Sequence, residues 1–192
     1  MSSPVVGVLA LQGAFARHIE TLRRVGVEAT EVRTPAQLDT VDALVLPGGE
    51  SSTMSKLLVT QGLLTPLADR LASGMPAFGT CAGMILLAVE VLDGIAGQAS
   101  FGAIDLTVRR NGYGRQIDSF EADLDVTGVD GGPFTAVFIR APVVTRVGPD
   151  VEVLAVARDT PVLVREGAIL ASSFHPELTD DDRLHRLFVD SI

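Results

Sequence analysis

The 192-residue sequence has one cysteine, three histidines, no tryptophan and few basic residues. A single cysteine excludes an internal disulfide, which fits a reducing, cytoplasmic location. The 24 acidic residues outnumber the 15 lysines and arginines, and this excess argues against nucleic acid as the main partner, because phosphates require a basic surface. There is no apolar run of about 18 residues, so no membrane span is expected. The first residues lack the charged and apolar pattern of a signal peptide.

The chain is 47% hydrophobic, which predicts a globular domain with a sizeable core. In the first half, apolar strand-like runs alternate with segments of helical spacing, a pattern typical of parallel strands covered by helices on both faces. The second half reads as short strands with turns, which predicts an antiparallel extension of the same sheet. We therefore expect an α/β fold with a mixed, mainly parallel sheet and a single domain over residues 1–192. Strands are predicted at 5–11, 27–33, 42–46, 75–78, 104–110, 117–126, 135–139, 151–157, 161–165 and 168–174.

The only cysteine lies in the sequence Gly79-Thr80-Cys81-Ala82-Gly83, between a short apolar strand and an apolar helix. This arrangement is the cysteine form of a nucleophile elbow, in which flanking glycines allow a sharp turn. The helix N-terminus favours the thiolate, which is the reactive form. The alternative is that Cys81 is a small buried apolar residue.

A second candidate element is Ser173-Phe174-His175-Pro176-Glu177, which follows the last predicted strand. In an extended chain, residues two apart point to the same side, so His175 and Glu177 are expected to share a face. A histidine that takes a proton from cysteine and is oriented by a carboxylate completes a nucleophile–base–orienter triad. Taken singly, each residue could instead be an ordinary loop side chain.

A third candidate is the loop Pro47-Gly48-Gly49-Glu50-Ser51-Ser52, which follows the strand at 42–46. Successive glycines can expose backbone N–H groups to an oxyanion. We expect one donor from Gly49 and the other from Ala82, directly after the cysteine. The loop could also be a simple strand-to-helix turn capped by Ser51 or Ser52.

The remaining histidines, His18 and His185, lie on the first and last predicted helices and are expected to be solvated. The last helix is expected to be capped near Thr179 or Asp180. Cys81, His175 and Glu177 could be zinc ligands, but they lack the close spacing of zinc motifs, and no metal site is predicted.

Together these motifs resemble the class I, or triad, glutamine amidotransferases. Within that class the chain is similar to the family of glutaminase subunits of pyridoxal 5'-phosphate synthases. The resemblance covers essentially the whole chain, and the blocks at 110–116 and 138–142 are specific to this family. The matching blocks are 7–14, 47–53, 79–85, 110–116, 119–122, 138–142 and 173–179.

The resemblance implies a role for each matching residue and a three-layer, flavodoxin-like fold. Cys81 matches the nucleophile, His175 the general base and acid, and Glu177 the residue that orients the histidine. Gln12 matches a residue that responds to the partner subunit. The residues that match glutamine-binding positions are Gly49, Glu50, Ser51, Arg110, Ile139 and Arg140. Without the resemblance, the two arginines could be surface charges and Ile139 a core residue.

The resemblance also implies the reaction and the partner. Glutamine is hydrolysed without a metal or organic cofactor, and the ammonia passes to a (β/α)₈-barrel synthase subunit in a large hetero-oligomer. Two features depart from the family pattern: Gly112-Tyr113 replaces a Ser-Phe-like pair, and the chain stops at Ile192, where relatives often continue. The first is expected to affect details of the glutamine pocket and the second a peripheral contact.

Two other classes of protein share part of this pattern. A cysteine peptidase or stress-response protein on a similar scaffold would keep the elbow and the histidine, but has no need for Glu50, Arg110 and Arg140 together. A catalytically silent binding module would be free to lose Cys81 or His175.

Overall fold

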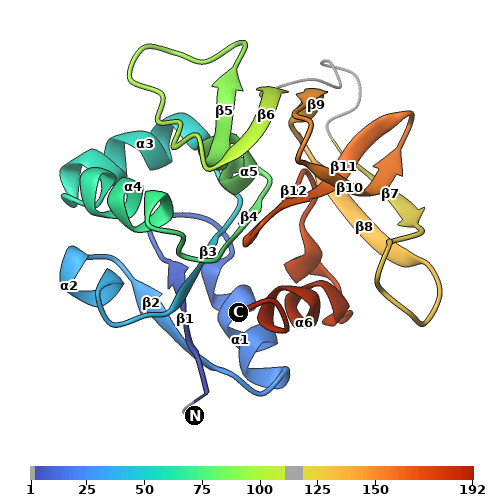
Figure 1. The fold of residues 1–192 in the computed structure, drawn as a ribbon, viewed down its shortest axis with the longest axis horizontal. Coiled ribbons are helices and arrows are strands. Elements are labelled where there is room, and N and C mark those ends of the chain that lie inside the picture. Colours follow the sequence, from blue (N-terminus) through green and yellow to red (C-terminus); the bar gives the residue numbers. More distant parts are fainter. Residues whose placement is uncertain (1–2, 111–118) are drawn as a thin grey trace.

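The computed structural model describes residues 3–110 and 119–192, and its central feature is a seven-stranded sheet (Figure 1). In chain order the strands are β1 (Val5–Leu9), β2 (Glu28–Val32), β3 (Ala43–Leu46), β4 (Ala77–Thr80), β10 (Glu152–Ala157), β11 (Thr160–Glu166) and β12 (Ile169–Ser172). Their order in the sheet is β10-β11-β12-β4-β3-β1-β2. The strands from β12 to β2 pair in parallel, and β11 and β10 add antiparallel. The predicted α/β class and antiparallel extension are confirmed.

Helices cover both faces of this sheet (Figure 1). They are α1 (Phe15–Arg24), α2 (Pro35–Leu38), α3 (Ser51–Thr60), α4 (Leu64–Ala72), α5 (Ala82–Leu87), the 3-10 helix η1 (Pro176–Leu178) and α6 (Arg183–Val189). Helix α1 contacts η1 and α6, whereas α3 contacts α4 and α5. Among the described residues no helix is both long and apolar enough to cross a membrane.

The sheet separates two apolar cores, and strand β3 shows why. Side chains alternate between the faces of a strand. Leu44 and Leu46 pack into the core under α3, α4 and α5, while Ala43 and Val45 pack into the core under α1 and α6. Because both faces are covered, every residue of β3 is buried, as expected for a central parallel strand.

The extension of the sheet is shorter than the sequence predicts. Strands β5 (Ala88–Val91), β6 (Ile104–Arg109) and β9 (Val143–Val147) form a separate three-stranded sheet, and β7 (Ser119–Leu124) pairs only with β8 (Phe134–Ile139) among the described strands. Helix α2 and strands β5 and β9 are not anticipated from the sequence. The apolar run at 84–89 reads as one helix, but the helix ends at Leu87 and β5 begins at Ala88. Periodicity alone cannot separate the two in so short a run.

The parallel strands bring the candidate site together. Gln12, the loop at 47–50, Cys81 and His175 follow β1, β3, β4 and β12, which are neighbours in the sheet. Sites in such sheets form at the carboxyl ends of the strands. The predicted convergence of these segments on one edge is confirmed.

Candidate active site

Cys81 occupies the sharp turn between β4 and α5, so the predicted elbow is confirmed. Its φ of 52° and ψ of −105° are uncommon for a residue with a side chain, and strain of this kind clusters at active sites. A Cβ on Gly83 would lie 2.0 Å from Leu46 O, so the start of α5 packs against β3 too closely for any side chain. The turn therefore needs glycine for close packing and places the thiol at the sheet edge.

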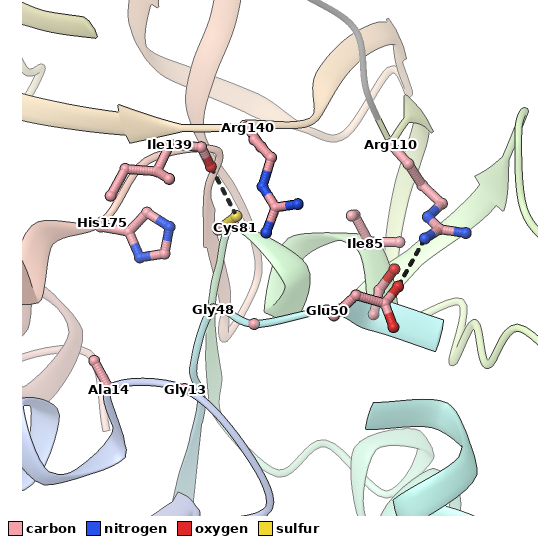
Figure 2. Close-up of a pocket in the computed structure, with 12 residues that line it drawn as sticks. Gly13, Ala14, Gly48, Glu50, Cys81, Ile85, Arg110, Ile139, Arg140 and His175 are labelled. Carbon is pink, nitrogen blue, oxygen red and sulfur yellow. Dashed lines mark hydrogen bonds and ion pairs between the residues drawn. The ribbon is translucent and has the colours of Figure 1, made fainter. Parts of the chain in front are cut away.

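Gly48 lies against both Cys81 and His175 (Figure 2). A Cβ added to Gly48 would lie 2.3 Å from His175 Cε1 and 3.3 Å from Cys81 Cβ. Any side chain at this position would displace the imidazole from the thiol. Gly48 is thus required for the geometry of the pair, a role that is not evident from the sequence alone.

His175 is held from two sides. Its backbone N–H donates to Val137 O at 2.9 Å, and its Nδ1 lies 2.8 Å from Glu177 Oε1. The expected pairing of His175 with Glu177 is confirmed, but the reason given for it is wrong. The segment is not extended: Pro176 begins the 3-10 helix η1, since its fixed φ suits the first position of a helical turn. The turn brings the two side chains together.

The electrostatics of His175 match its position. Burial lowers the pKa of the imidazole, but the interactions with Cys81 and Glu177 outweigh burial and raise this pKa to about 10. Burial also raises the pKa of Glu177, but the hydrogen bond from His175 and the electrostatic interactions with His18 and His175 together outweigh it, and the pKa of the carboxyl lies below its ordinary value. At neutral pH the site therefore holds an imidazolium beside the sulfur and a carboxylate behind the imidazolium.

His18 and His185 are fully buried, so the expectation that they are solvated is wrong. His18 Nδ1 lies 2.9 Å from His185 Nε2, and His18 Nε2 lies 3.3 Å from Glu177 Oε2. A signal for this was present in the sequence. His18 falls at helical spacing with Leu22, on the apolar face of α1. Likewise His185 lies three residues before Phe188 on α6, so the two share one face of the helix. The last helix begins at Arg183 with no side-chain cap, so the predicted cap near Thr179 or Asp180 is also wrong.

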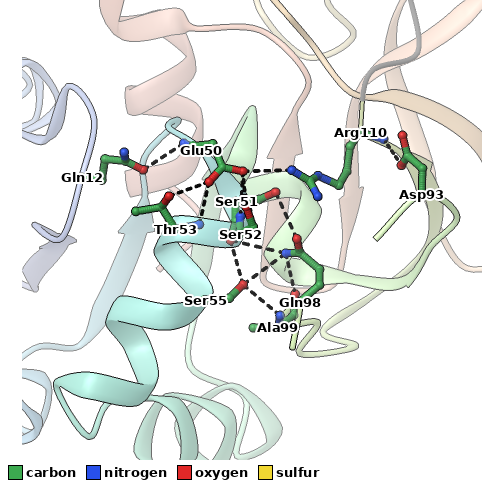
Figure 3. Close-up of polar contacts among 10 residues, drawn as sticks. All are labelled: Gln12, Glu50, Ser51, Ser52, Thr53, Ser55, Asp93, Gln98, Ala99 and Arg110. Atoms are coloured by element: carbon green, nitrogen blue, oxygen red, sulfur yellow. Dashed lines mark hydrogen bonds and ion pairs between the residues drawn. The ribbon is translucent and has the colours of Figure 1, made fainter. Parts of the chain in front are cut away.

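Glu50 is the N-cap of α3, not Ser51 or Ser52 (Figure 3). Its carboxylate accepts hydrogen bonds from the backbone N–H groups of Ser52 and Thr53, at 3.1 and 2.8 Å, and from both of their hydroxyls. The hydroxyls of Ser52 and then Thr53 make the largest contributions to lowering the pKa of Glu50 to about 2. Arg110 Nη2 lies 2.9 Å from the same carboxylate. The negative charge is therefore permanent and faces the site.

A pocket of about 450 Å³ opens beside Cys81 (Figure 2), a volume typical of small-molecule sites. Arg110 and Arg140 both line it, Arg140 beside Cys81 and Arg110 against Glu50. Cys81 Sγ lies 3.9 Å from the carbonyl oxygen of Ile139. Every predicted glutamine-binding residue lines the pocket. The lining residues are Gly13, Ala14, Gly48, Gly49, Glu50, Ser51, Cys81, Ile85, Arg110, Ile139, Arg140 and His175.

The predicted oxyanion donors lie on two neighbouring segments. Ala82 is the first residue of α5, and a first-turn N–H has no acceptor within its own helix. Gly49 lies in the loop after β3, and Gln12 holds that loop by accepting a hydrogen bond from the Glu50 N–H at 2.9 Å (Figure 3). Gln12 thus contacts the loop that carries the proposed donor.

Two further expectations concern a metal site and the Gly112-Tyr113 pair. The described residues include no group of three or more histidine, cysteine, aspartate or glutamate side chains arranged to hold a metal ion. Gly112-Tyr113 lies outside the residues that the structure describes. Arg110 borders that segment, and its backbone N–H donates to Asp93 Oδ1 at 2.6 Å.

Comparisons with known proteins agree with this geometry. Residues 8–192 match the SNO glutamine amidotransferase family. A relative from Mycolicibacterium vanbaalenii, named pyridoxal 5'-phosphate synthase subunit PdxT, is 61% identical over 100% of both chains. A crystal structure described as a glutamine amidotransferase superposes with a TM-score of 0.90 at 52% identity, covering 97% of each chain. The PurLQS structure from Thermotoga maritima, at 14% identity, has a TM-score of 0.67 over 98% of this chain and 99% of that one, a likeness of fold alone.

Proposed function

The chain belongs to the SNO glutamine amidotransferase family, and from this premise we propose that Cys81, His175 and Glu177 hydrolyse L-glutamine to glutamate and ammonia. The chain is the glutaminase subunit of a pyridoxal 5'-phosphate synthase. The observation that carries the catalytic assignment is the elbow cysteine facing a histidine whose Nδ1 lies 2.8 Å from a buried carboxylate.

The reaction begins at the sulfur. The Cys81 thiolate attacks the side-chain amide carbon of glutamine, and the carbonyl oxygen becomes an oxyanion. The N–H groups of Gly49 and Ala82 stabilise this oxyanion, and one such donor is worth about 2.7–4 kcal/mol. When the C–N bond breaks, the His175 imidazolium gives its proton to the leaving nitrogen and ammonia departs.

The second half regenerates the enzyme. His175, now neutral, takes a proton from water, and the hydroxide attacks the thioester carbon. The C–S bond breaks, glutamate leaves, and the thiolate and imidazolium are restored. Glu177 remains a carboxylate throughout and keeps His175 Nδ1 protonated and aligned.

Recognition of free glutamine needs partners for its ammonium and carboxylate. We assign these to the residues around the pocket: Glu50 and Arg110, which pair with each other at 2.9 Å, and Arg140. Gly49, Ser51 and Ile139 form the rest of the binding surface. The permanent charge on Glu50 supports this, because its low pKa makes it an anion at every working pH.

The ammonia has an acceptor in the proposed assembly. We assign as partner a (β/α)₈-barrel synthase subunit in a large hetero-oligomer, with this chain acting as one domain over residues 1–192 in the cytoplasm. This chain supplies the ammonia that the synthase subunit uses.

The test of the proposed function is Cys81→Ala in the complex with the synthase. We expect ammonia release from glutamine to disappear while the thermal midpoint stays close to that of the parent chain. A diazo-ketone analogue of glutamine should label Cys81 alone, as shown by peptide mass analysis. Labelling elsewhere, or full activity in the variant, would exclude Cys81 as the nucleophile.

A further inference from the structure

The reaction written above does not use two buried histidines, one of which contacts the triad through Glu177. His185 on α6 contacts His18 on α1, with Nε2 and Nδ1 2.9 Å apart. His18 Nε2 in turn lies 3.3 Å from Glu177 Oε2, and the other carboxylate oxygen meets His175. The two histidines are fully buried. A continuous line of polar side chains therefore runs from α6 through α1 to Cys81.

We propose that His18 is a positioning residue of the triad: its Nε2–H donates to Glu177 Oε2, and His185 Nε2–H donates to His18 Nδ1, so that Glu177 presents Oε1 to His175. This inference rests on the glutaminase activity proposed above and deepens it. His18 acts only through Glu177 and touches neither the substrate nor the sulfur.

The hydrogen-bond network assigns the tautomers. With the proton of His18 on Nε2, that nitrogen faces a carboxylate oxygen, and Nδ1 is a free acceptor for the His185 Nε2–H. This leaves His185 Nδ1 as a bare lone pair, which agrees with its having no hydrogen-bond partner among the described residues. The reversed arrangement would bury an N–H at that nitrogen without an acceptor, which is energetically costly.

The reversed arrangement has a second fault, at the other end of the line. It would aim the bare lone pair of His18 Nε2 at the carboxylate of Glu177. The hydroxyl of Thr80, 3.4 Å from the same nitrogen, could then donate to it, but the repulsion between lone pair and carboxylate would remain. Burial supports neutral histidines, because desolvation lowers the pKa of both His18 and His185.

Glu177 Oε2 explains why a donor is needed here. This atom is buried, and the described residues offer it no hydrogen bond of ordinary geometry. Among the described residues, its polar contact is His18 Nε2, at 3.3 Å. Catalytic hydrogen bonds are often long in the empty enzyme and tighten when substrate binds. A neutral donor also leaves the charge of the triad unchanged, which a lysine or arginine would not.

The first experiment measures glutamine hydrolysis in the complex with the synthase, for His18→Ala and His18→Gln. We expect His18→Ala to lower kcat by about tenfold to a hundredfold, the scale of a misplaced catalytic group, with KM changed less than about twofold. The acid limb of kcat/KM should move to higher pH, because a carboxylate with fewer donors protonates more easily. His18→Gln, whose amide N–H replaces Nε2–H, should restore most of kcat.

Leu22→Ala is the matched control. Leu22 is fully buried on the same helix but belongs to the apolar core. This variant should lower the thermal midpoint and leave kcat and the pH profile unchanged. If His18→Ala behaves like Leu22→Ala, the positioning role is wrong. If the parent complex fails to hydrolyse glutamine, or Cys81→Ala remains active, the proposed function itself fails, so the two failures are distinguishable.

A second measurement needs no variant. The chain has only three histidines, so their ring nitrogens can be resolved by ¹⁵N NMR of histidine-labelled protein. We expect His18 and His185 to be neutral, with the proton on Nε2, between about pH 6.5 and 8, and His175 to carry a proton on Nδ1. A proton on Nδ1 of neutral His18 would overturn the proposal even if the variants fail to fold.

Discussion

At the scale of single residues, the site depends on two side chains held in an uncommon backbone conformation. Cys81 and Arg140 both have positive φ, 52° and 43°. Both line the same pocket. Such strain persists only where the surrounding structure holds it. The backbone therefore aims the proposed nucleophile and a cation into one pocket before any ligand arrives.

Arg140→Ala tests whether the guanidinium of Arg140 binds glutamine. Arg140 is exposed in the pocket, so its loss should scarcely affect folding. Losing one charge-assisted contact to glutamine should cost about 1.5–3 kcal/mol, or roughly ten- to a hundredfold in kcat/KM. The measurement is steady-state ammonia release alongside thermal unfolding. Arg158→Ala is the control, because Arg158 also has positive φ but lies in the turn between β10 and β11. Equal kinetic losses in both variants would remove Arg140 from recognition.

At the scale of elements, helices α1 and α3 each combine a structural role with a role in the proposed site. Glu50 caps α3 and pairs with Arg110 in the pocket. Helix α1 carries His18, and it directly follows the loop that contains Gln12. Displacing α1 would therefore disturb both the oxyanion loop and the orienting carboxylate.

Glu50→Ala should consequently lower stability as well as activity. Losing an N-cap costs about 0.5–2 kcal/mol of folding free energy, and kcat/KM should also fall by about tenfold or more as the charged partner of glutamine is lost. Urea unfolding and ammonia release measure the two effects. Thr34→Ala is the control, because Thr34 caps α2 away from the pocket. Thr34→Ala should lower stability without changing kcat/KM. If Glu50→Ala also lowers stability alone, Glu50 caps α3 but does not bind glutamine.

At the scale of the whole molecule, the sheet topology and the two cores decide which charges are buried. His18 faces His185, Glu177 and His175, and His185 faces His18 and Arg24. Burial keeps both histidines neutral in the folded chain. In the unfolded chain they titrate near their ordinary pKa of 6.5.

Stability should therefore fall as pH drops below about 6.5, because the unfolded state then binds protons that the folded state does not. His175 acts in the opposite sense. Its pKa is raised to about 10, so the stability that it contributes is complete below 6.5 and is lost as pH rises toward 10. Unfolding free energies from urea titrations at pH 5, 6.5 and 8 would measure the loss of stability on the acid side, from His18 and His185, and on the alkaline side, from His175. His185→Leu should make the acid limb shallower, and an unchanged slope would contradict this account.

The assembly should control the activity of this chain. Gln12 holds the loop through the Glu50 N–H at 2.9 Å. A docked synthase subunit that moves Gln12 could turn the Gly49 N–H toward the oxyanion, since a glycine peptide rotates at low steric cost. One donor is worth about 10²- to 10³-fold in rate. We expect the isolated chain to be a poor glutaminase and the synthase to activate it by roughly this factor.

Ammonia release at saturating glutamine, with and without the synthase, measures the activation. Gln12→Ala should reduce the response, whereas Gln61→Ala, which removes an exposed amide at the end of α3, should not. Equal rates with and without the synthase would refute activation by the partner. A full response from Gln12→Ala would assign the switch to another residue.

The sequence by itself determines the parts of this site that depend on local chemistry. The glycines around Cys81, the Pro47-Gly48-Gly49 turn and the His175-Pro176-Glu177 segment each follow a predicted strand. Because parallel strands end at one edge of a sheet, their convergence follows once the alternating pattern is recognised. These are properties of a few consecutive residues and of periodicity.

Only the tertiary structure decides which polar side chains are desolvated and what they meet. His18 and His185 are 167 residues apart, and Glu50 and Arg110 are 60 apart. Periodicity shows that His18 lies on the apolar face of its helix, but not that α6 and η1 cover that face. The pKa, the tautomer and hence the role of a buried histidine depend on such covering groups, and these come from distant parts of the chain.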